Sequence, residues 1–366
     1  MSAPTATAPH TPHTPIGRVL GVSIALAALV AVVVLAFAWP SVTAEPHNLP
    51  VAIAGPEQAV TAVTAALDEK QPDVLAFDEV DDRDAAVAAI EKREVYGAII
   101  LSGTPGTAPE VLTSSAANLA VSQLLTGIGS ALEAQVNAQA AAAASAAGAP
   151  APAHIAVTVT DVVPLAASDP RGTGLTAAMF PLVMGGMIGG IAISIAVIGA
   201  LRRVLAVVVY SAVGGLVLTG ILAGWFGVLE GDFWAEAAVI ALALAAIAAP
   251  ITGAVALLGR AGIAVGPIVM MLFANPISGA AMPREFLPGV WGQIGQWFPP
   301  GAAANLLRDV SYFPQADASF SWLVLGAWTV GGLLLSVLGH FRTAGGAESD
   351  ELAAHEDDRE PASLPA

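Results

Sequence analysis

Long runs of apolar residues and one polar stretch divide this chain into three parts. The first apolar run, residues 16–39, carries Arg18 as its only charge, and a mostly polar stretch follows over residues 40–173. A bilayer core about 30 Å thick is crossed by roughly 20 apolar residues in a helix. The first run meets that length and has no evident signal-peptide cleavage site after it, so we predict a retained first transmembrane helix. Five further runs follow the polar stretch, at residues 175–200, 204–226, 235–258, 263–281 and 322–341.

The run at residues 263–281 differs from the others because it contains Pro267 and Pro276. Proline removes a backbone hydrogen bond, and in lipid the freed carbonyls must find other partners. We therefore expect a kinked or discontinuous helix there. The predicted fold class is an α-helical polytopic membrane protein with six transmembrane helices, one before and five after an α/β domain, the last five lying in residues 174–342.

Arginine and tryptophan at the ends of the runs predict the orientation. Cytoplasmic loops of membrane proteins are enriched in arginine and lysine, and tryptophan prefers the membrane interface. If the N-terminus is cytoplasmic, every short inner connection carries an arginine and most of the tryptophans fall at outer ends. Both termini are then cytoplasmic and residues 40–173 are extracellular. The inner arginines are Arg18, Arg202, Arg203, Arg260 and Arg342.

The polar stretch contains alternating strand and helix patterns. Short apolar runs bounded by glycine, proline or aspartate predict strands, and helical spacing of apolar residues predicts the elements between them. The resulting βαβαβ order favours a small sheet flanked by helices, to which a long alanine-rich helix and a last strand are added. In chain order the expected elements are strand 49–54, helix 57–70, strand 73–77, helix 84–94 with Asp84 as its cap, strand 96–101, helix 116–144 and strand 154–163.

Composition supports a membrane location and narrows the function classes. Hydrophobic residues make up 56% of the chain and charged residues 11%, whereas a soluble domain has about 25% charged residues. The net charge of −16 is concentrated in the polar stretch and the C-terminal tail, which argues against nucleic acid as a partner. The absence of cysteine excludes disulfides and thiolate chemistry. Residues 1–15 and the acidic residues 343–366 are expected to be disordered cytoplasmic tails.

A search for catalytic motifs predicts that the chain is not an enzyme. A phosphate-binding loop, GxxxxGK[ST], needs a lysine before serine or threonine, and neither Lys70 nor Lys92 is followed by either. HExxH and GxSxG are also absent, so no metal, cofactor or serine nucleophile is predicted. The spans carry almost no internal charge, which disfavours a proton path. The carboxylates before and at the start of the fourth span are interpreted as solvated loop residues. Among them, Glu236 is the residue to test for a role in proton transport.

Glycines four residues apart place small residues on one face of two spans. Such pairs allow neighbouring helices to approach closely. We expect packing within one subunit, with a dimer seam as the alternative, at Gly185, Gly186, Gly189, Gly190, Gly220 and Gly224.

Residues 275–313 form the most distinctive stretch of the chain. The sequence NPISGAAMPREFLPGVWGQIGQWFPPGAAANLLRDVSYF combines prolines, aromatic residues and charges just before the last span. It is too apolar for a solvated loop and too charged for a span, so it is expected to lie in the outer interface or to re-enter the bilayer as short helices. We interpret it as an outer gate, with a passive lid anchored by Trp291 and Trp297 as the alternative. The gate candidates are Asn275, Pro276, Trp297, Pro299, Pro300, Arg308 and Asp309.

The order of one span, a large domain and five spans, together with NPISG, MPREFLP and IGQWFPPGAAANLLRDVSYF, resembles the type 2 permease family of ABC exporters. The chain is similar in particular to actinobacterial members and to phage-infection-protein-like membrane proteins, whose outer domains carry stretches like LPVAIAGP and AIEKREVYGAIIL. The likeness extends over about residues 16–342. It implies an export permease in the bacterial plasma membrane, working as a homodimer or with a second permease, and energised by a separate cytoplasmic ABC ATPase.

Three functions are open at this point. The first is the export permease, and the second is a non-transporting membrane scaffold or secretion accessory that acts through its extracellular domain. The third, a proton-driven transporter, lacks the expected carboxylates within the spans. A permease without a phosphate-binding loop must contact its ATPase through the short inner connections. Arg202, Arg203 and Arg260 are the candidates there, for docking or, as the alternative, for setting the topology.

Overall fold

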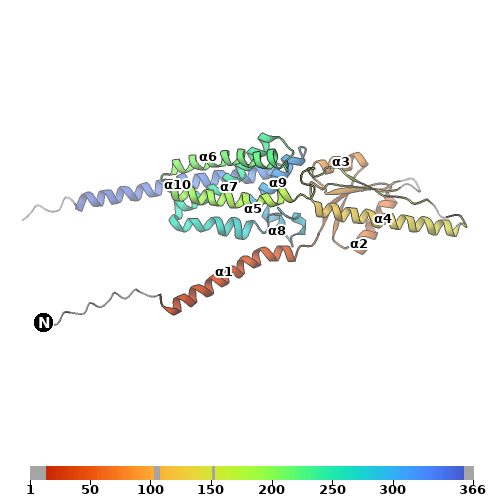
Figure 1. Cartoon of the computed structure of the whole chain (residues 1–366), viewed down its shortest axis with the longest axis horizontal. Helices are drawn as coiled ribbons and strands as arrows, with labels where there is room; N and C mark the ends of the chain where they lie inside the picture. Colours follow the sequence, from red (N-terminus) through yellow and green to blue (C-terminus); the bar gives the residue numbers. More distant parts are fainter. Residues whose placement is uncertain (1–13, 103–107, 151–152, 358–366) are drawn as a thin grey trace, which may run out of the picture.

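Long helices and a smaller α/β domain lie end to end in this protein (Figure 1). The structure is a computed structural model that describes residues 14–102, 108–150 and 153–357. Within this part of the chain, five helices are long and apolar enough to cross a membrane, which supports a polytopic membrane protein. They are α1 (Ile16–Val42), α5 (Thr173–Ala196), α6 (Ala200–Thr219) extended by the π-helix η1 (Gly220–Trp225), α7 (Phe233–Leu258) and α10 (Ser319–Asp357).

The structure has five such helices where the sequence predicts six spans, and the difference lies at residues 263–281. The chain there winds into a 3₁₀-helix, η2 (Gly259–Ala264), and a short π-helix, η3 (Gly266–Ala274). Pro267 lies in the first turn of η3 and Pro276 follows its end, so a regular helix does not continue through them. Gly262 packs so closely on α7 that an added Cβ would lie 2.3 Å from the carbonyl carbon of Ala254. The expected discontinuity is present, but in a shorter element than predicted.

Helix α7 forms the centre of the bundle, with α5, α6 and α10 packed around it (Figure 1). Most of its length is buried, and many of the buried residues are alanine or glycine. In lipid, close van der Waals packing between small residues holds helices together. Gly253 of α7 and Gly332 of α10 each lie against the other helix's backbone, where an added Cβ would come within 2.5 Å of a backbone atom. Contact of this kind gives the bundle a single packed arrangement.

The glycines of α5 face α6 and α7. An added Cβ at Gly189 would lie 2.3 Å from the Tyr210 ring, and one at Gly190 would lie 2.9 Å from the backbone of Ala248. The Tyr210 hydroxyl donates a 2.7 Å hydrogen bond to the Gly185 carbonyl. An added Cβ at Gly186 would lie 2.7 Å from the Cβ of Ile247. These four glycines therefore pack within one subunit.

The packing predicted for Gly220 and Gly224 does not occur within the described chain. An added Cβ at either position would have no atom within 4 Å. Both glycines lie in η1, where the winding changes from an α-helix to a π-helix. Both positions are exposed, so no neighbouring helix of the described chain covers this face of η1.

The α/β domain is built on a five-stranded sheet with the order β2-β1-β3-β4-β5. Strands β1, β2 and β3 are parallel to one another, whereas β4 runs antiparallel to β3 and parallel to β5. The sequence predicts a strand at each of these places except β4. The strands are β1 (Leu49–Ala54), β2 (Leu75–Glu79), β3 (Gly97–Ile100), β4 (Glu110–Thr113) and β5 (Thr158–Asp161).

Helices cover both faces of the sheet and enclose a core of aliphatic side chains. Helices α2 (Glu57–Lys70) and α4 (Leu119–Ala146) pack on one face, and α3 (Arg83–Glu91) packs on the other. The Asp82 side chain caps α3 by accepting a 2.8 Å hydrogen bond from the Ala85 N–H, so the cap lies two residues before the predicted Asp84. Asn118 caps α4 in the same way, accepting from the Ala120 N–H at 2.9 Å. Both caps satisfy N–H groups that have no partner within the helix.

Helix α10 continues through the region predicted to be a disordered tail. Its apolar part ends at Gly339, yet the helix runs to Asp357. Residues 343–357 are rich in alanine and glutamate, which favour helix, and a helix already formed in the bundle extends without a new nucleation step. The tail predicted at residues 1–15 lies outside the described residues, apart from Thr14 and Pro15.

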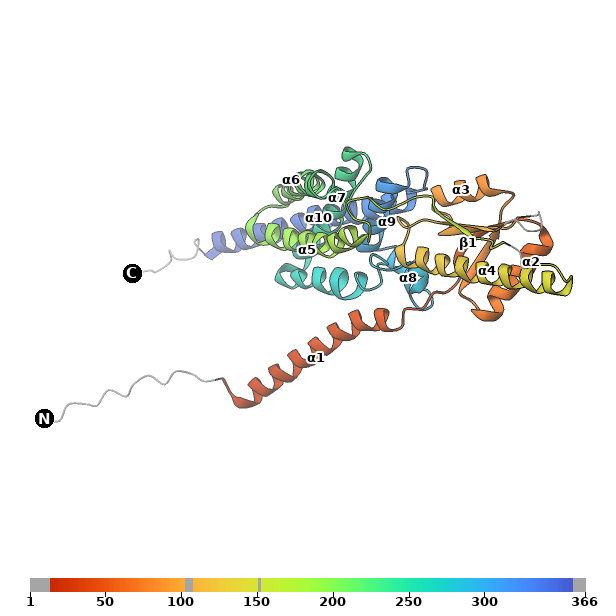
Figure 2. The ribbon, with the colours of Figure 1, turned by 45° about the vertical axis from the view of Figure 1, so that its right-hand side comes forward.

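Helix α1 diverges from the rest of the bundle and approaches it only at the end nearest the sheet (Figure 2). The helix ends at Val42 rather than at the predicted Trp39. Trp39 packs edge-on against Trp291, with ring centroids 6.2 Å apart. The apolar residues before it are exposed on every side of the helix, which is the surface expected of a helix surrounded by lipid.

Replacement of Gly190 by alanine should destabilise the bundle, because the new Cβ would meet the backbone of Ala248, which cannot rotate away. Overpacking of this kind costs about 1–3 kcal/mol. The matched change Gly224→Ala adds a methyl group in open space and should leave stability unchanged or slightly higher. Thermal unfolding of both variants in one detergent measures the difference, and equal midpoints would contradict the packing described for α5.

The predicted orientation can be tested with single cysteines, since the chain contains none. Glu69→Cys lies on the exposed end of α2, and Ala261→Cys is exposed in η2, which follows α7 at the other end of the bundle. In intact cells an impermeant maleimide should label the first position and should reach the second only after the membrane is opened. The reverse labelling pattern would show that the α/β domain is cytoplasmic.

Candidate functional site

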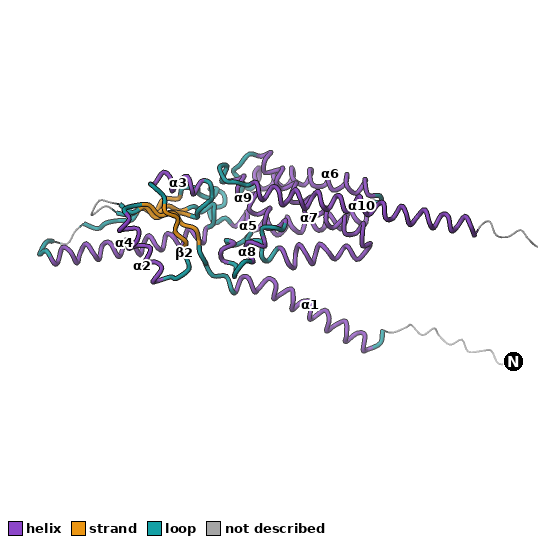
Figure 3. The backbone as a smooth tube through the Cα atoms, turned by 180° about the vertical axis from the view of Figure 1, so that it is seen from behind, coloured by secondary structure: helices purple, strands orange, loops and turns teal. Residues whose placement is uncertain are grey.

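Residues 275–313, here called the connecting segment, form short helices between the bundle and the sheet (Figure 3). They are η4 (Arg284–Phe286), α8 (Trp291–Gly295) and α9 (Pro299–Tyr312). Pro299 and Pro300 are buried and begin α9. Proline suits the first helical turn because the N–H that it lacks would have no partner there. The two prolines therefore start a helix in this segment and do not break one.

Close backbone contacts fold the connecting segment back on itself. An added Cβ at Gly295 would lie 1.8 Å from the Ile277 carbonyl oxygen, and one at Gly292 would lie 2.1 Å from the Arg284 carbonyl oxygen. No side chain fits at either place. These glycines allow α8 to lie directly on the turns before it, so that α9 begins beside η3.

Arg93 of the α/β domain binds two residues of α9. Its Nη1 donates to Asp309 Oδ1 at 2.5 Å, and its Nη2 donates to Asn305 Oδ1 at 2.9 Å. Only 16% of the Arg93 side chain and 10% of the Asp309 side chain are exposed. The guanidinium carbon also lies 5.8 Å from the centre of the Phe313 ring, a cation–π distance. A buried charge pair with these additional contacts fixes the position of the domain on α9.

The backbone of Arg93 is unusual, with φ at 59°. This left-handed region is sparsely occupied by residues other than glycine and asparagine. Arg93 directly follows Lys92, the last residue of the α3 turn, and its N–H donates to the Ile90 carbonyl at 2.9 Å. The turn at the end of α3 thus directs the Arg93 side chain towards α9.

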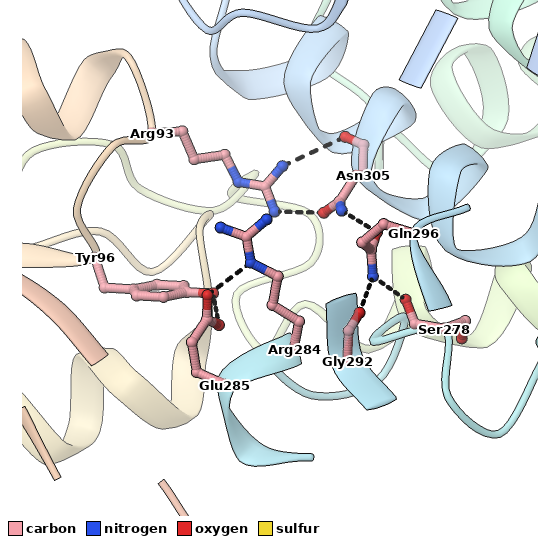
Figure 4. Close-up of polar contacts among 8 residues, drawn as sticks. All are labelled: Arg93, Tyr96, Ser278, Arg284, Glu285, Gly292, Gln296 and Asn305. Carbon is pink, nitrogen blue, oxygen red and sulfur yellow. Dashed lines mark hydrogen bonds and ion pairs between the residues drawn. The ribbon is translucent and has the colours of Figure 1, made fainter. Parts of the chain in front are cut away.

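Amide side chains extend this network into the connecting segment (Figure 4). Asn305 Nδ2 donates to Gln296 Oε1. Gln296 is buried, and its Nε2 donates to the carbonyls of Ser278 at 3.0 Å and Gly292 at 3.1 Å. A chain of hydrogen bonds therefore leads from Arg93 through α9 to the turns that follow η3.

A second contact between the domain and the segment surrounds Glu285. Tyr96 donates its hydroxyl to Glu285 Oε2 at 2.8 Å, and Arg284 Nε donates to Glu285 Oε1 at 2.7 Å (Figure 4). The backbone joins here as well, because the His47 N–H donates to the Glu285 carbonyl at 3.1 Å and the Glu45 N–H donates to the Phe286 carbonyl at 3.1 Å. The link that follows α1 is therefore bonded to the connecting segment.

Burial and charge act in opposite directions on the titratable groups of this network. Burial raises the pKa of Asp309 above its ordinary value, while the Arg93 charge and hydrogen bond lower it. Burial also raises the pKa of Tyr96, and the neighbouring Glu285 carboxylate adds to the rise. Tyr96 therefore remains a hydroxyl donor to Glu285 at every physiological pH.

Glu236 joins α7 to α9 and is fully buried. Its Oε1 accepts hydrogen bonds from the Gly231 N–H at 2.8 Å and from the Ser311 hydroxyl at 3.0 Å. Oε2 has no hydrogen-bond partner among the described residues. The interpretation of Glu236 as a solvated loop carboxylate is wrong, because α9 covers the start of α7.

The predicted gate residues fall into three groups in the structure. Asn275 and Pro276 form the turn after η3, where the Ser278 hydroxyl donates to the Asn275 carbonyl at 2.7 Å. Trp297 is 60% exposed and packs edge-on against Phe320 with centroids 4.9 Å apart. The remaining four belong to α9, in which Arg308 lines cavities and the others are buried, namely Pro299, Pro300 and Asp309.

The three predicted coupling arginines also differ from one another. Arg203 Nε donates to the Val197 carbonyl at 2.8 Å, and its Nη2 donates to the Ser194 carbonyl at 3.0 Å. These bonds satisfy carbonyls at the end of α5, so Arg203 has a structural role as a C-terminal cap. Arg202 and Arg260 are exposed at the ends of α6 and α7 that lie away from the sheet.

Sequence reasoning did not single out Arg93, Tyr96, Gln296 or Asn305 as site residues. One local signal is present, because Lys92 and Arg93 place two cations in the last turn of the helix predicted at residues 84–94, just before the strand predicted at 96–101. Gln296 and Asn305 are likewise polar residues in a stretch that is otherwise apolar, where an amide needs a hydrogen-bond partner. Arg93 and Tyr96 each bind a partner about 200 positions away in the chain, Asp309 and Glu285 respectively. No local pattern identifies these two partners.

No protein-family model, curated protein or solved structure matches this chain. Within the ranges that the structure describes, no group of three or more histidine, aspartate and glutamate residues is placed to hold a metal ion. The contacts described at this site are hydrogen bonds and charge pairs between the helix bundle and the α/β domain.

Replacement of Arg93 by glutamine should lower stability by about 3–5 kcal/mol, because it leaves the Asp309 carboxylate buried without a counter-charge. The pKa of Asp309 then lies still further above the unfolded value of about 3.9. Between the unfolded pKa and the raised folded pKa of Asp309, the folded state binds more protons than the unfolded state. The free energy of unfolding therefore falls as the pH rises through this range. Thermal unfolding at pH 5 and pH 8 should show the larger loss at pH 8.

The double variant Arg93→Gln/Asp309→Asn is the control for this experiment. It removes the buried charge, so it should recover part of the lost stability and should lose the added pH dependence. Strictly additive losses from the two single changes would show that Arg93 and Asp309 do not interact.

Proposed function

We propose that this chain is the membrane-spanning permease subunit of an ATP-driven exporter of the ABC class, energised by a separate cytoplasmic ATPase. In this proposal the α/β domain is extracellular, the connecting segment is the outer gate, and two permease subunits form the pathway. The observation that carries the proposal is the irregular winding of two helices, one of which leads into the connecting segment. The π-helix η1 ends α6, and the π-helix η3 leads into the segment.

Irregular helices in a membrane bundle indicate a functional site. π-helical turns are rare and occur frequently at functional sites. A cavity of about 650 Å³ lies between the α/β domain and the connecting segment, lined in part by Tyr96, Gln296 and Arg308. Its volume is within the range of small-molecule sites.

The contacts of α9 supply a route for coupling. Arg93 binds α9 to the α/β domain, and Ser311 binds it to Glu236 at the start of α7. Helix α9 also packs against α7 and α10. A shift of α7 or α10 in the bundle is therefore transmitted to the domain through α9, which is the relation required of a gate.

Energy for such a shift must come from another subunit, because the chain has no phosphate-binding loop. Arg202 and Arg260 are exposed at the end of the bundle away from the sheet and have the charge to contact acidic residues of an ATPase. Arg203 is engaged in capping α5. We assign Arg202 to the docking surface and Arg203 to the stability of the turn.

A scaffold that acts through the α/β domain is the second candidate. The observation in its favour is a groove of about 370 Å³ between α2 and α4, lined mainly by apolar residues such as Leu67, Leu124 and Leu132. A partner protein that binds this groove would need no motion of the bundle, so ATPase activity separates the two candidates.

The wild-type chain, purified from its native membranes in mild detergent, should carry ATPase activity supplied by its partner. Arg202→Gln should lower that activity severalfold without changing the thermal midpoint, whereas Arg202→Lys keeps the charge and should retain it. Arg203→Gln should instead lower the thermal midpoint, because the end of α5 loses its cap. A wild-type preparation without ATPase activity would contradict the export proposal and favour the scaffold.

A further inference from the structure

Arg308 is the one predicted gate residue whose charge no neighbour takes up. It is half-buried on α9, next to Asp309 in the sequence, but the Asp309 carboxylate is bonded to Arg93. Within the described part of the chain, Arg308 forms no hydrogen bond or ion pair of its own. Burial lowers the pKa of Arg308 to about 10, and the charge of Arg93 adds to this. Arg308 is still protonated at neutral pH, so a positive charge lies here with no ion-pair partner among the residues that the structure describes, although the neighbouring Asp309 charge attracts it.

Two cavities meet at this side chain. Arg308 and Asn118 line both the cavity of about 650 Å³ described above and a smaller one of about 260 Å³. The smaller cavity is bounded by the beginnings of α4 and α5 and by Ala281 of the connecting segment. Arg308 therefore points its charge into a cleft between the α/β domain and the bundle.

The smaller cavity is positively charged. Its lining contains Arg171 and Arg308 and no acidic residue. Arg171 is exposed and, like Arg308, has no hydrogen bond or ion pair among the described residues. The first residues of α4 also line it, and the Ala120 and Val121 N–H groups there already donate to Asn118 Oδ1, so the positive charge of this cavity comes from the two arginines.

The acidic residues of the larger cavity do not cancel this charge. Glu285 is bonded to Arg284, and Asp309 is bonded to Arg93. Asp317 accepts a hydrogen bond from the Ser319 N–H at 3.0 Å, and Glu94 and Lys92 also line the cavity. The carboxylates of Glu285 and Asp309 are thus already paired with other arginines, and neither is bonded to Arg308.

We propose that the cleft around Arg308 and Arg171 binds an anionic phosphoryl group. Two guanidinium groups offer the paired N–H donors that match phosphate oxygens. The hydroxyls of Ser115 and Thr176 line the same cavity but already donate to Asp161 and to a backbone carbonyl, so among these described residues the arginines are the free donors. The binding site requires no ATPase and does not depend on the transport proposal.

The phosphoryl group has two sources, an anionic lipid headgroup or free phosphate. The location favours the lipid, because the larger cavity is also lined by Trp297 and Phe320. These rings are 60% and 41% exposed and pack edge-on at the sheet-side end of the spans, where aromatic side chains mark the membrane interface. A headgroup in the cleft would leave its acyl chains beside these rings.

The experiment measures binding to the full-length chain, purified and delipidated in detergent. The probes are inorganic phosphate at constant ionic strength, dioctanoyl phosphatidylglycerol and, as the zwitterionic control, dioctanoyl phosphatidylcholine. Phosphatidylglycerol should bind more tightly than phosphatidylcholine. Arg308→Gln and Arg171→Gln should each weaken its binding by about tenfold or more, the effect of losing a charge-assisted hydrogen bond. Lys70→Gln removes an exposed cation of the same domain outside the cleft and should bind as the wild type does.

The variants distinguish the outcomes. Binding of phosphate as well as phosphatidylglycerol, with the same loss in both arginine variants, assigns the site to the phosphoryl group itself, and binding of phosphatidylglycerol alone assigns it to a lipid. Equal binding by the wild type and both arginine variants, or no preference for the anionic lipid, would overturn the proposal. If Arg308→Gln fails to fold, Arg171→Gln decides the matter, because Arg171 is exposed and contributes nothing to the core.

Discussion

The buried pair between Arg93 and Asp309 is the interaction on which the arrangement of this protein depends. It joins an α/β domain to a helix bundle at a place where both charged side chains are largely buried. Such a pair is costly to desolvate and is stable only when further hydrogen bonds satisfy both groups. Asn305 and the Phe313 ring provide these contacts for the guanidinium. The requirement for all of them at once permits one orientation of the domain on α9.

The two parts that this pair joins are stabilised by different forces. The sheet is covered on both faces by aliphatic side chains, as expected where burial from water drives folding. Helix α7 instead contacts its neighbours largely through alanine and glycine, as expected where lipid removes that driving force and only close contact remains. Helix α9 is stabilised in both ways, because one side packs against the bundle and the other carries the polar network that binds the α/β domain.

Local patterns predicted the elements whose signal lies in consecutive residues. The bounds of β1 and α2 agree with the sequence pattern, and so do the positions of the five long helices. Elements that depend on distant neighbours were not predictable in the same way, as for β4, which exists because β3 and β5 lie on either side of it. The site followed the same division. Asp309 and Arg308 stand out as charges in an apolar stretch, whereas Arg93 becomes important only once the fold places it beside them.

The left-handed backbone of Arg93 has a consequence for how this position tolerates change. Judged by local conformation alone, position 93 suits glycine or asparagine, which occupy that region of φ and ψ with little strain. Substitution to glycine would relax the turn after α3 while disconnecting the domain from α9. A library screened for thermal stability of the isolated α/β domain would therefore select against arginine at this position, and one screened on the intact membrane protein would retain it. The residue found at position 93 would therefore show whether a screen selects for stability of the isolated domain or for assembly of the domain with the bundle.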